Sequence, residues 1–179
     1  ILPQVSTIRD ALDADAATVV VKERETAHLL SRLTADPDLV VCDSQVVLKM
    51  TADVPPHVRC TTFSILFARL KGDLCKLAAG AAAVDRLGKG ARVLIAESCT
   101  HHAAEDDIGR VKIPRWLRQY TGLPLEVDVY AGRDFPRNLG GYDLVVQCGG
   151  CMNNRREVLS RIAACEAEGV PMTNYGMCI

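Results

Sequence analysis

Short apolar runs alternate with amphipathic segments along most of the chain. The runs are rich in valine, isoleucine and leucine and are apolar almost throughout, which is typical of strands buried on both faces of a parallel sheet. Six runs predict strands, at residues 18–22, 38–43, 91–98, 125–131, 142–148 and 170–176. Apolar residues at helical spacing predict helices over residues 23–35, 62–87 and 153–168. Asn153 or Asn154 is the candidate cap of the last helix. The pattern therefore predicts an α/β fold.

A turn-forming stretch divides this pattern in two. The sequence DRLGKGARVLI at residues 85–95 indicates a helix end, a Gly/Lys turn and a new strand. We therefore predict two small domains, residues 1–87 and 88–179, each with a mainly parallel sheet flanked by helices. The first has few strands and a long Ala/Leu-rich helix, so it leaves open sheet edges and an apolar helix face. We expect homodimerisation through residues 1–87, with a neighbouring domain as the alternative cover.

Composition and charge exclude several classes of protein. The chain is 49% hydrophobic and 24% charged, which is ordinary for a globular protein. Its formal net charge of −1 argues against a nucleic-acid binder, and no apolar run approaches the roughly 20 residues of a membrane span. The chain begins without Met or a signal pattern, so we expect a piece of a longer protein. Eight cysteines without a secretion signal indicate a reduced, cytoplasmic setting more than a disulfide scaffold.

Two of the predicted strands run directly into cysteine. Cys99 follows the strand at 91–98, and Cys148 ends the strand at 142–148 and begins the motif C-G-G-C, which Cys151 completes. If these strands are parallel neighbours, their carboxyl ends meet and the three sulfurs share one place. The two glycines allow a tight turn that brings backbone amides close to sulfur charge. We predict a three-thiolate metal site, which meets the ligand demand of an iron–sulfur cluster apart from one position.

Other interpretations of the cysteines stay open. C-x-x-C also marks a thioredoxin-like redox pair, or simply small residues in a tight turn. A Cys₃His zinc site completed by His101 or His102 fits the residue types equally well, with Glu97 or Glu105 as a hydrolytic base. The acidic run at 105–107 is interpreted as a solvated loop or a helix start. Five further cysteines stand singly in apolar contexts and are interpreted as small buried residues, namely Cys42, Cys60, Cys75, Cys165 and Cys178.

Several segments occur in the order found in one protein family. They are CTHH at 99–102, DDIGRVKIPRWL at 106–117, DLVVQCGGCMNNRR at 143–156 and GVPMTNYG at 169–176. With them the chain resembles the HydF family, the maturation GTPases of FeFe-hydrogenase, over essentially its whole length. HydF-like proteins comprise a GTPase domain, a dimerisation domain and a domain that binds a 4Fe-4S cluster. The chain resembles the last two and contains no G-x-x-x-x-G-K-[S/T] phosphate loop, so the GTPase domain is expected to be absent from it.

The resemblance also implies a set of cluster ligands. The family's motif is C-x-H, a long spacer, and then H-C-x-x-C. It carries over as Cys99 and His101, and as Cys148 and Cys151, so the implied cluster-binding residues are the three cysteines. Gln147 stands where the family has its second histidine, and an amide is not a conventional cluster ligand.

The fourth position at the cluster stays open. The candidates are His101, His102, a residue before Ile1 and an exchangeable small ligand, of which we favour the last. The resemblance further implies a scaffold and carrier role. HydF-like proteins receive a diiron precursor made with two radical-SAM maturases, HydE and HydG, and deliver it to apo-hydrogenase. We expect the present chain to act as a scaffold without catalytic turnover of its own.

Overall fold

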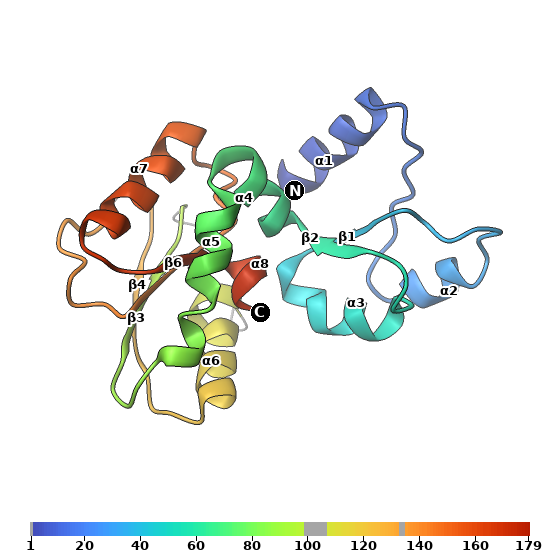
Figure 1. The fold of residues 1–179 in the computed structure, drawn as a ribbon. Coiled ribbons are helices and arrows are strands. Elements are labelled where there is room, and N and C mark those ends of the chain that lie inside the picture. Colours follow the sequence, from blue (N-terminus) through green and yellow to red (C-terminus); the bar gives the residue numbers. More distant parts are fainter. Residues whose placement is uncertain (1, 99–106, 133–134) are drawn as a thin grey trace. The chain divides into compact units, whose positions relative to one another are not determined.

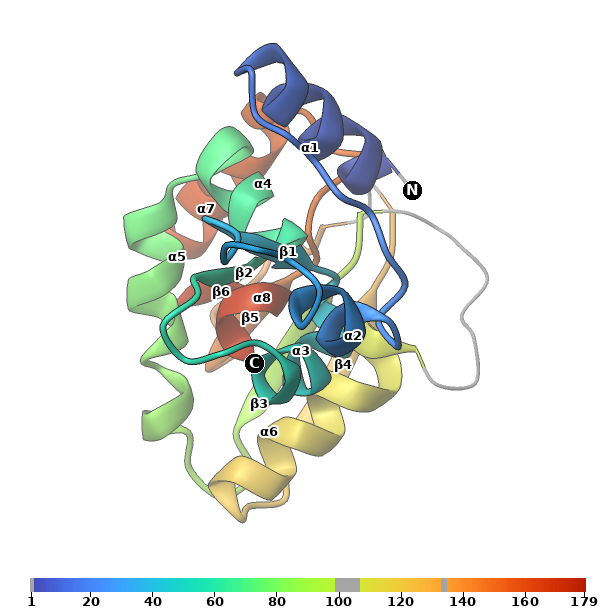
Figure 2. The same ribbon diagram turned by 90° about the vertical axis from the view of Figure 1, so that its right-hand side faces the viewer.

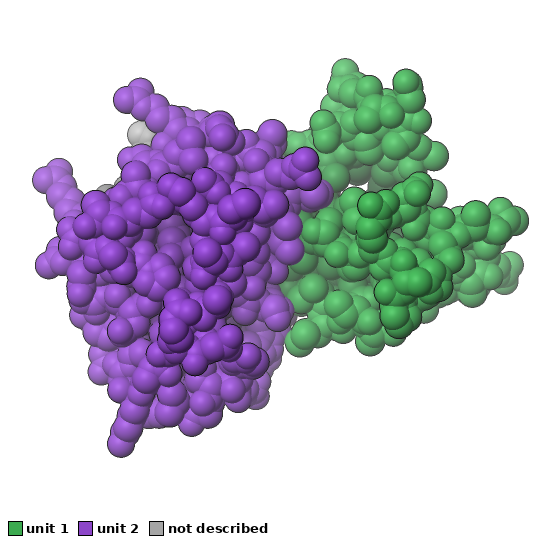
Figure 3. Space-filling view, in the orientation of Figure 1, with its two compact units in different colours: residues 1–63 green, residues 64–179 purple. Residues whose placement is uncertain are grey.

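The computed structural model describes residues 2–98, 107–132 and 135–179 (Figure 1). The chain divides into two compact units, residues 1–63 and residues 64–179, which Figure 3 shows in different colours. Each unit contains a parallel sheet with helices, which confirms the predicted α/β class with two small domains. The boundary predicted between residues 87 and 88 falls inside the second unit.

Unit 1 (residues 1–63) is built around two short parallel strands. Its elements are α1 (Leu2–Asp13), α2 (Thr26–Leu30), β1 (Val40–Cys42), the 3₁₀ turn η1 (Ser44–Val46), α3 (Val47–Asp53) and β2 (Cys60–Thr62). Strands β1 and β2 pair side by side (Figure 2). A small core forms from Cys42, Met50, Val54 and Val58. The helix predicted over residues 23–35 is reduced to the single turn and a half of α2.

The strand predicted at residues 18–22 is wrong. This segment runs without regular structure between α1 and α2, and Val20 in its middle is 69% exposed. A β-strand needs a hydrogen-bonding neighbour, and the described part of unit 1 pairs only β1 with β2. The valine-rich run has the composition of a strand and no partner inside its own unit.

Unit 2 (residues 64–179) contains a four-stranded, fully parallel sheet in the order β4-β3-β5-β6. The strands are β3 (Arg92–Ala96), β4 (Glu126–Tyr130), β5 (Leu144–Gln147) and β6 (Met172–Asn174). The helical elements are α4 (Phe63–Lys71), α5 (Leu74–Ala81), η2 (Val84–Arg86), the π-helical turn η3 (Ile108–Lys112), α6 (Ile113–Thr121), α7 (Arg155–Ala167) and α8 (Tyr175–Cys178). No helix in the described ranges is long and apolar enough to cross a bilayer.

Helices cover both faces of this sheet. Side chains of a strand alternate between faces, so Val93 and Ile95 join the core beneath α6 and α8, whereas Leu94 and Ala96 join the core beneath α4, α5 and α7. All four residues of β5 are buried. This two-sided burial explains why the strands read as continuous apolar runs in the sequence.

The long helix predicted over residues 62–87 is divided into α4, α5 and η2. The break between α4 and α5 lies at Gly72 and Asp73, and Asp73 caps α5 by accepting a hydrogen bond from the backbone N–H of Lys76 at 3.1 Å. The helix predicted over residues 153–168 is confirmed as α7. Its cap is Asn154, whose side chain accepts from the N–H of Glu157 at 2.9 Å.

The order of the strands creates a switch point in the middle of the sheet. From β3 the chain passes to β4 on one side and then returns to β5 on the other side. In open parallel sheets, ligands bind outside the carboxyl ends of the two strands where the direction of winding reverses. Here these are β3 and β5, the strands that lead into Cys99 and Cys148.

Candidate functional site

The two strands that lead to cysteine are direct neighbours, which is the condition on which the predicted three-thiolate site depends. Ala96 at the end of β3 is in register with Gln147 at the end of β5, and the backbone N–H of Cys148 donates to the carbonyl of Ala96 at 2.9 Å. Ser98 and Cys148 therefore lie together at the carboxyl edge of the sheet. Three of the predicted site residues, Cys99, His101 and His102, lie outside the described residues. The convergence of all three sulfurs stays a prediction.

The sulfur of Cys148 is surrounded by hydrogen-bond donors. The backbone N–H of Ser98 donates to it at 3.1 Å, the Ser98 hydroxyl lies at 3.0 Å, and the side-chain amide of Gln147 donates at 3.6 Å. A neutral thiol accepts hydrogen bonds only weakly, whereas donors directed at sulfur stabilise a thiolate. The surroundings of Cys148 therefore suit a negatively charged sulfur ligand.

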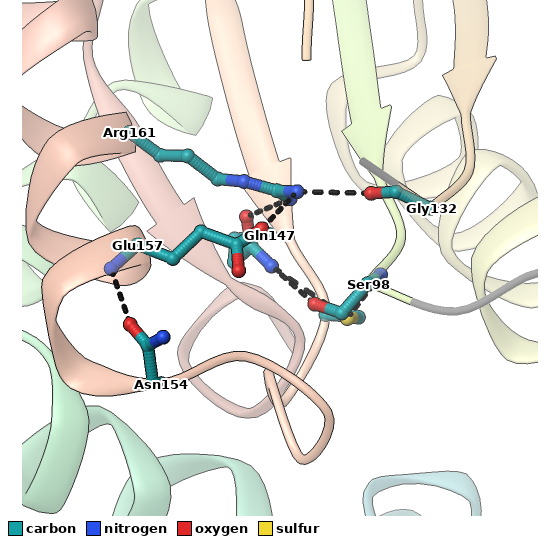
Figure 4. A network of polar contacts seen from close by, with 7 residues as sticks. Ser98, Gly132, Gln147, Asn154, Glu157 and Arg161 are labelled. Atoms are coloured by element: carbon teal, nitrogen blue, oxygen red, sulfur yellow. Dashed lines mark hydrogen bonds and ion pairs between the residues drawn. The ribbon is translucent and has the colours of Figure 1, made fainter. Parts of the chain in front are cut away.

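Gln147 connects this sulfur to a buried arginine. Figure 4 shows Arg161 of α7 extending toward Gln147 and Gly132, with Ser98 on the other side of Gln147. The Arg161 guanidinium donates to Gln147 Oε1 at 3.1 Å, to the carbonyl of Gly132 at 3.0 Å and to Glu157 Oε1 at 3.1 Å. Gln147 Nε2 donates to Ser98 Oγ at 3.0 Å. Gln147, which stands where the resemblance implies a histidine, thus has both its oxygen and its nitrogen engaged in hydrogen bonds.

Arg161 is only 4% exposed. Its charge is balanced by Glu157 and its flat face lies over the ring of Phe135, with 5.0 Å between the guanidinium carbon and the ring centroid. Burial of an arginine is costly unless its donors are satisfied. Sequence reasoning missed this residue, although one signal was present: Arg161 falls on the apolar face of α7 beside Val158 and Ile162. A charge on a buried face indicates a polar network inside the fold.

The C-G-G-C loop depends on glycine at one position. Gly150 has a φ of +64°, in the left-handed region that disfavours other residues, and it is buried. Gly149 packs near Ser64, since a Cβ at this glycine would lie 3.3 Å from Ser64 Oγ. The tight turn expected between the two cysteines is therefore present, and Gly150 is the residue that permits it.

Lys71, at the end of α4, holds the same loop from outside. Its ammonium group donates to the carbonyl oxygens of Gly150 at 3.1 Å, Cys151 at 3.1 Å and Asn153 at 2.9 Å. Burial lowers the pKa of Lys71, and the nearby Cys151 opposes that shift. In return, Arg155 of α7 donates to the carbonyl of Leu70 at 2.8 Å. The loop and the end of α4 are tied to each other in both directions.

These surroundings can be tested for their fit to a cluster with thiolate ligands. Among the described residues, the buried side-chain nitrogen of Asn153 has no hydrogen-bond acceptor, and it lies two residues after Cys151. An unused donor, a cation at the loop and three donors on Cys148 all suit a group that carries negative charge on sulfur. The donor chemistry of the residues present therefore fits such a cluster, which Cys148 and Cys151 would help to hold. Within the described ranges, no group of three His, Cys, Asp or Glu residues could hold a metal ion.

The acidic candidates have structural partners. Glu97 is buried and forms an ion pair with Arg110 at 2.9 Å, so its carboxylate has a partner within the fold. Asp107 caps η3 by accepting from the backbone N–H groups of Gly109 and Arg110, both at 2.9 Å. This confirms the helix-start interpretation for the end of the acidic run, whereas Glu105 lies outside the described residues.

The scattered cysteines differ in their environments. Cys42 and Cys165 are buried, as expected for small apolar residues, and burial raises the pKa of each thiol to about 12. For Cys42 the neighbouring Cys60 contributes to the same rise in pKa. Cys60 and Cys178 are half-buried. The prediction is wrong for Cys75, which is exposed on α5 because the helix turns its Leu77 side toward the core.

Comparison with known families accounts for the whole chain. The family model described as "Hydrogen maturase F dimerization domain" matches residues 1–72, and the one described as "Hydrogen maturase F tetramerization domain" matches residues 75–179. No curated protein matches the chain. Both models describe parts of one protein, and their order along the chain agrees with the resemblance carried by the cysteine motifs. The chain belongs to the hydrogen maturase F (HydF) family.

Proposed function

We propose that this chain is the oligomerisation and cluster-binding part of a hydrogenase maturation scaffold. It binds a 4Fe-4S cluster through Cys99, Cys148 and Cys151. It holds a diiron precursor supplied by the radical-SAM maturases HydE and HydG, and it delivers this precursor to apo-hydrogenase. The chain itself acts as a carrier and does not catalyse a reaction.

The observation that supports this proposal best is the environment of Cys148. Its sulfur accepts hydrogen bonds from Ser98 and Gln147 at the switch point of the sheet, where parallel α/β proteins bind their ligands. Ser98 is the residue directly before Cys99, so the segment that carries the third thiolate starts at the same edge. A buried metal centre with thiolate ligands needs this kind of surrounding set of donors.

The fourth position is proposed to carry an exchangeable ligand. Gln147 does not compete for it, because its oxygen accepts from Arg161 and its nitrogen donates to Ser98. Three strongly bound thiolates and one labile position suit a protein that passes a cluster-linked group onward. When bound, the cluster supplies a redox-active anchor for that group.

We also propose that unit 1 forms the homodimer, within the predicted range 1–87. Helix α1 buries none of its residues in this chain, and its exposed apolar side chains are Leu2, Val5 and Leu12. The segment Val19–Val21 adds further exposed valines. A second copy of the chain is the occupant that the family's dimerization domain implies. We further propose a reducing, cytoplasmic location, in which the seven described cysteines would stay free thiols, as they are in this structure.

Anaerobic reconstitution with iron and sulfide tests the cluster directly. We expect a brown protein with about four irons per chain that becomes EPR-active on reduction. Single Cys99→Ala, Cys148→Ala and Cys151→Ala variants should each lose stable cluster binding. Cys75→Ala, which removes an exposed thiol, is the matched control and should keep the full iron content.

Two outcomes of this experiment would overturn the proposal. Tight binding of zinc without iron uptake would favour a Cys₃His zinc domain. Retention of a full cluster in Cys99→Ala would show that Cys99 is not a ligand and that the two strand ends do not supply one common metal centre.

A further inference from the structure

We infer that Arg161 and Gln147 form a hydrogen-bond relay to the Cys148 sulfur that raises the reduction potential of the cluster. This inference rests on the proposed function, because it assigns a role toward a bound cluster. Neither residue is a ligand in this scheme. Arg161 and Gln147 are positioning residues that act through the sulfur of Cys148.

The chemistry of Arg161 fixes the direction of the relay. A guanidinium group has only donors, so the atom of Gln147 that faces it at 3.1 Å is the carbonyl oxygen. The amide nitrogen of Gln147 must then point the other way, toward Ser98 Oγ at 3.0 Å and Cys148 Sγ at 3.6 Å. Gln147 is 2% exposed, so water does not offer it alternative partners.

The Ser98 hydroxyl continues the same polarity. Its oxygen accepts from Gln147, and its hydrogen donates to the Cys148 sulfur 3.0 Å away when that sulfur is a thiolate, which has no hydrogen of its own. The backbone N–H of Ser98 donates to the same sulfur. Cys148 thus accepts from one backbone and two side-chain donors, and both side-chain donors depend on the orientation of Gln147.

Arg161 gives the relay its charge and its rigidity. Its three hydrogen bonds reach Gln147 at the end of β5, Gly132 in the segment after β4, and Glu157 one turn earlier on α7. The two partners of the ion pair differ in exposure: the Arg161 side chain is 4% exposed and the Glu157 side chain is 35% exposed. Solvent therefore screens the carboxylate more than the guanidinium, and the positive charge acts on the polarised amide of Gln147.

The consequence concerns the two redox states of the cluster. Reduction adds negative charge that is shared by the cysteine sulfurs, and donors directed at those sulfurs stabilise the reduced state more than the oxidised state. Loss of the donors at Cys148 should lower the reduction potential while leaving the three thiolates in place. A lower potential with the cluster retained would distinguish a relay residue from a ligand, because loss of a ligand would remove the cluster.

The test uses substitutions at Gln147 in the reconstituted protein. Gln147→Leu keeps the size of the side chain and removes both its acceptor and its donor. Gln119→Leu, an exposed glutamine on α6, is the matched control. The measurements are iron content, reduction potential by EPR-monitored titration, and urea unfolding of the metal-free chain.

We expect Gln147→Leu to bind iron fully and to show a lower reduction potential, and Gln119→Leu to match wild type. In a second pair, Ser98→Ala should also lower the reduction potential. Its control, Arg156→Met on the exposed side of α7, should keep the wild-type potential. If folded Gln147→Leu and Ser98→Ala both keep the wild-type potential, the relay is overturned and the proposed cluster stands. If wild type itself takes up no iron, the proposed function is overturned and the relay with it.

Discussion

The ammonium group of Lys71 donates a hydrogen bond to the carbonyl oxygen of Cys151 at 3.1 Å, although the two residues are 80 positions apart. Lys71 is the last residue of α4, and it reaches the neighbouring carbonyls of Gly150 and Asn153 as well. Arg155 closes the arrangement by donating back to Leu70 at the end of α4. The conformation of the C-G-G-C loop therefore depends on a helix far away in the sequence.

Replacing Lys71 should loosen this loop. Lys71→Met keeps the apolar stem and leaves three carbonyl oxygens without their donor, so we expect a loss of about 2 kcal/mol in the free energy of unfolding. Urea unfolding of the metal-free chain measures this loss, and the rate of iron release from the reconstituted protein should rise. Arg69→Met, an exposed position on the same helix, is the control. Equal stability of the two variants would show that the loop holds its shape without Lys71.

The contact between α5 and β6 should tolerate no side chain at Gly80. A Cβ there would overlap the carbonyl oxygen of Met172, which is backbone and cannot turn aside. Gly80→Ala should therefore cost about 3 kcal/mol of stability, because α5 would have to move off the sheet. Gly88→Ala, where a Cβ meets no atom within 4 Å, should change the stability by about 0.5 kcal/mol at most. Thermal unfolding followed by circular dichroism compares the two.

The buried thiol of Cys165 should make the protein sensitive to alkaline pH. Burial raises its pKa from 9.0 to about 12 in the folded state, so the folded chain keeps a proton that the unfolded chain loses. The stabilisation is complete below pH 9 and is lost as the pH rises toward 12, at roughly 1.4 kcal/mol per pH unit. Urea unfolding between pH 8 and pH 11 should show a shallower decline for Cys165→Ala than for wild type. An identical slope in the two proteins would contradict this assignment; Cys75→Ala controls for removal of a thiol as such.

The exposed valines of unit 1 provide a test of its dimer contact. Val20→Asp places a charge at the centre of the segment Val19–Val21 and should shift the protein toward smaller assemblies, because burial of an unpaired carboxylate is costly. Analytical ultracentrifugation over a dilution series measures the shift. Thr34→Asp adds the same charge at an exposed polar position of the same unit and should leave the assembly unchanged. If Val20→Asp forms assemblies of the same size as wild type, this segment is not part of the dimer interface.

Much of the fold was predictable from local patterns. The apolar runs that became β3 and β5 are buried on both faces, and this is the condition under which a strand shows continuous hydrophobicity. Asn154 and α7 followed from capping chemistry and helical periodicity. The strand prediction at 18–22 was wrong because valine-rich composition only favours an extended, partly buried backbone. A strand forms there only if a neighbouring strand is present to pair with it.

The sequence by itself determined the alternation of strands and helices, the two cysteines of the C-G-G-C turn and the arrival of Cys148 at a strand end, because each of these depends on residues close together in the chain. Tertiary structure alone decided which strands are neighbours, and so brought Ser98 to the sulfur of Cys148. It also brought Arg161 to Gln147 and Lys71 to the loop of Cys151. These contacts join segments that no local pattern relates, since each is set by how β3, β5, α4 and α7 pack in three dimensions. The cysteines themselves can thus be found in the sequence, whereas the groups that contact them are brought together only by the fold.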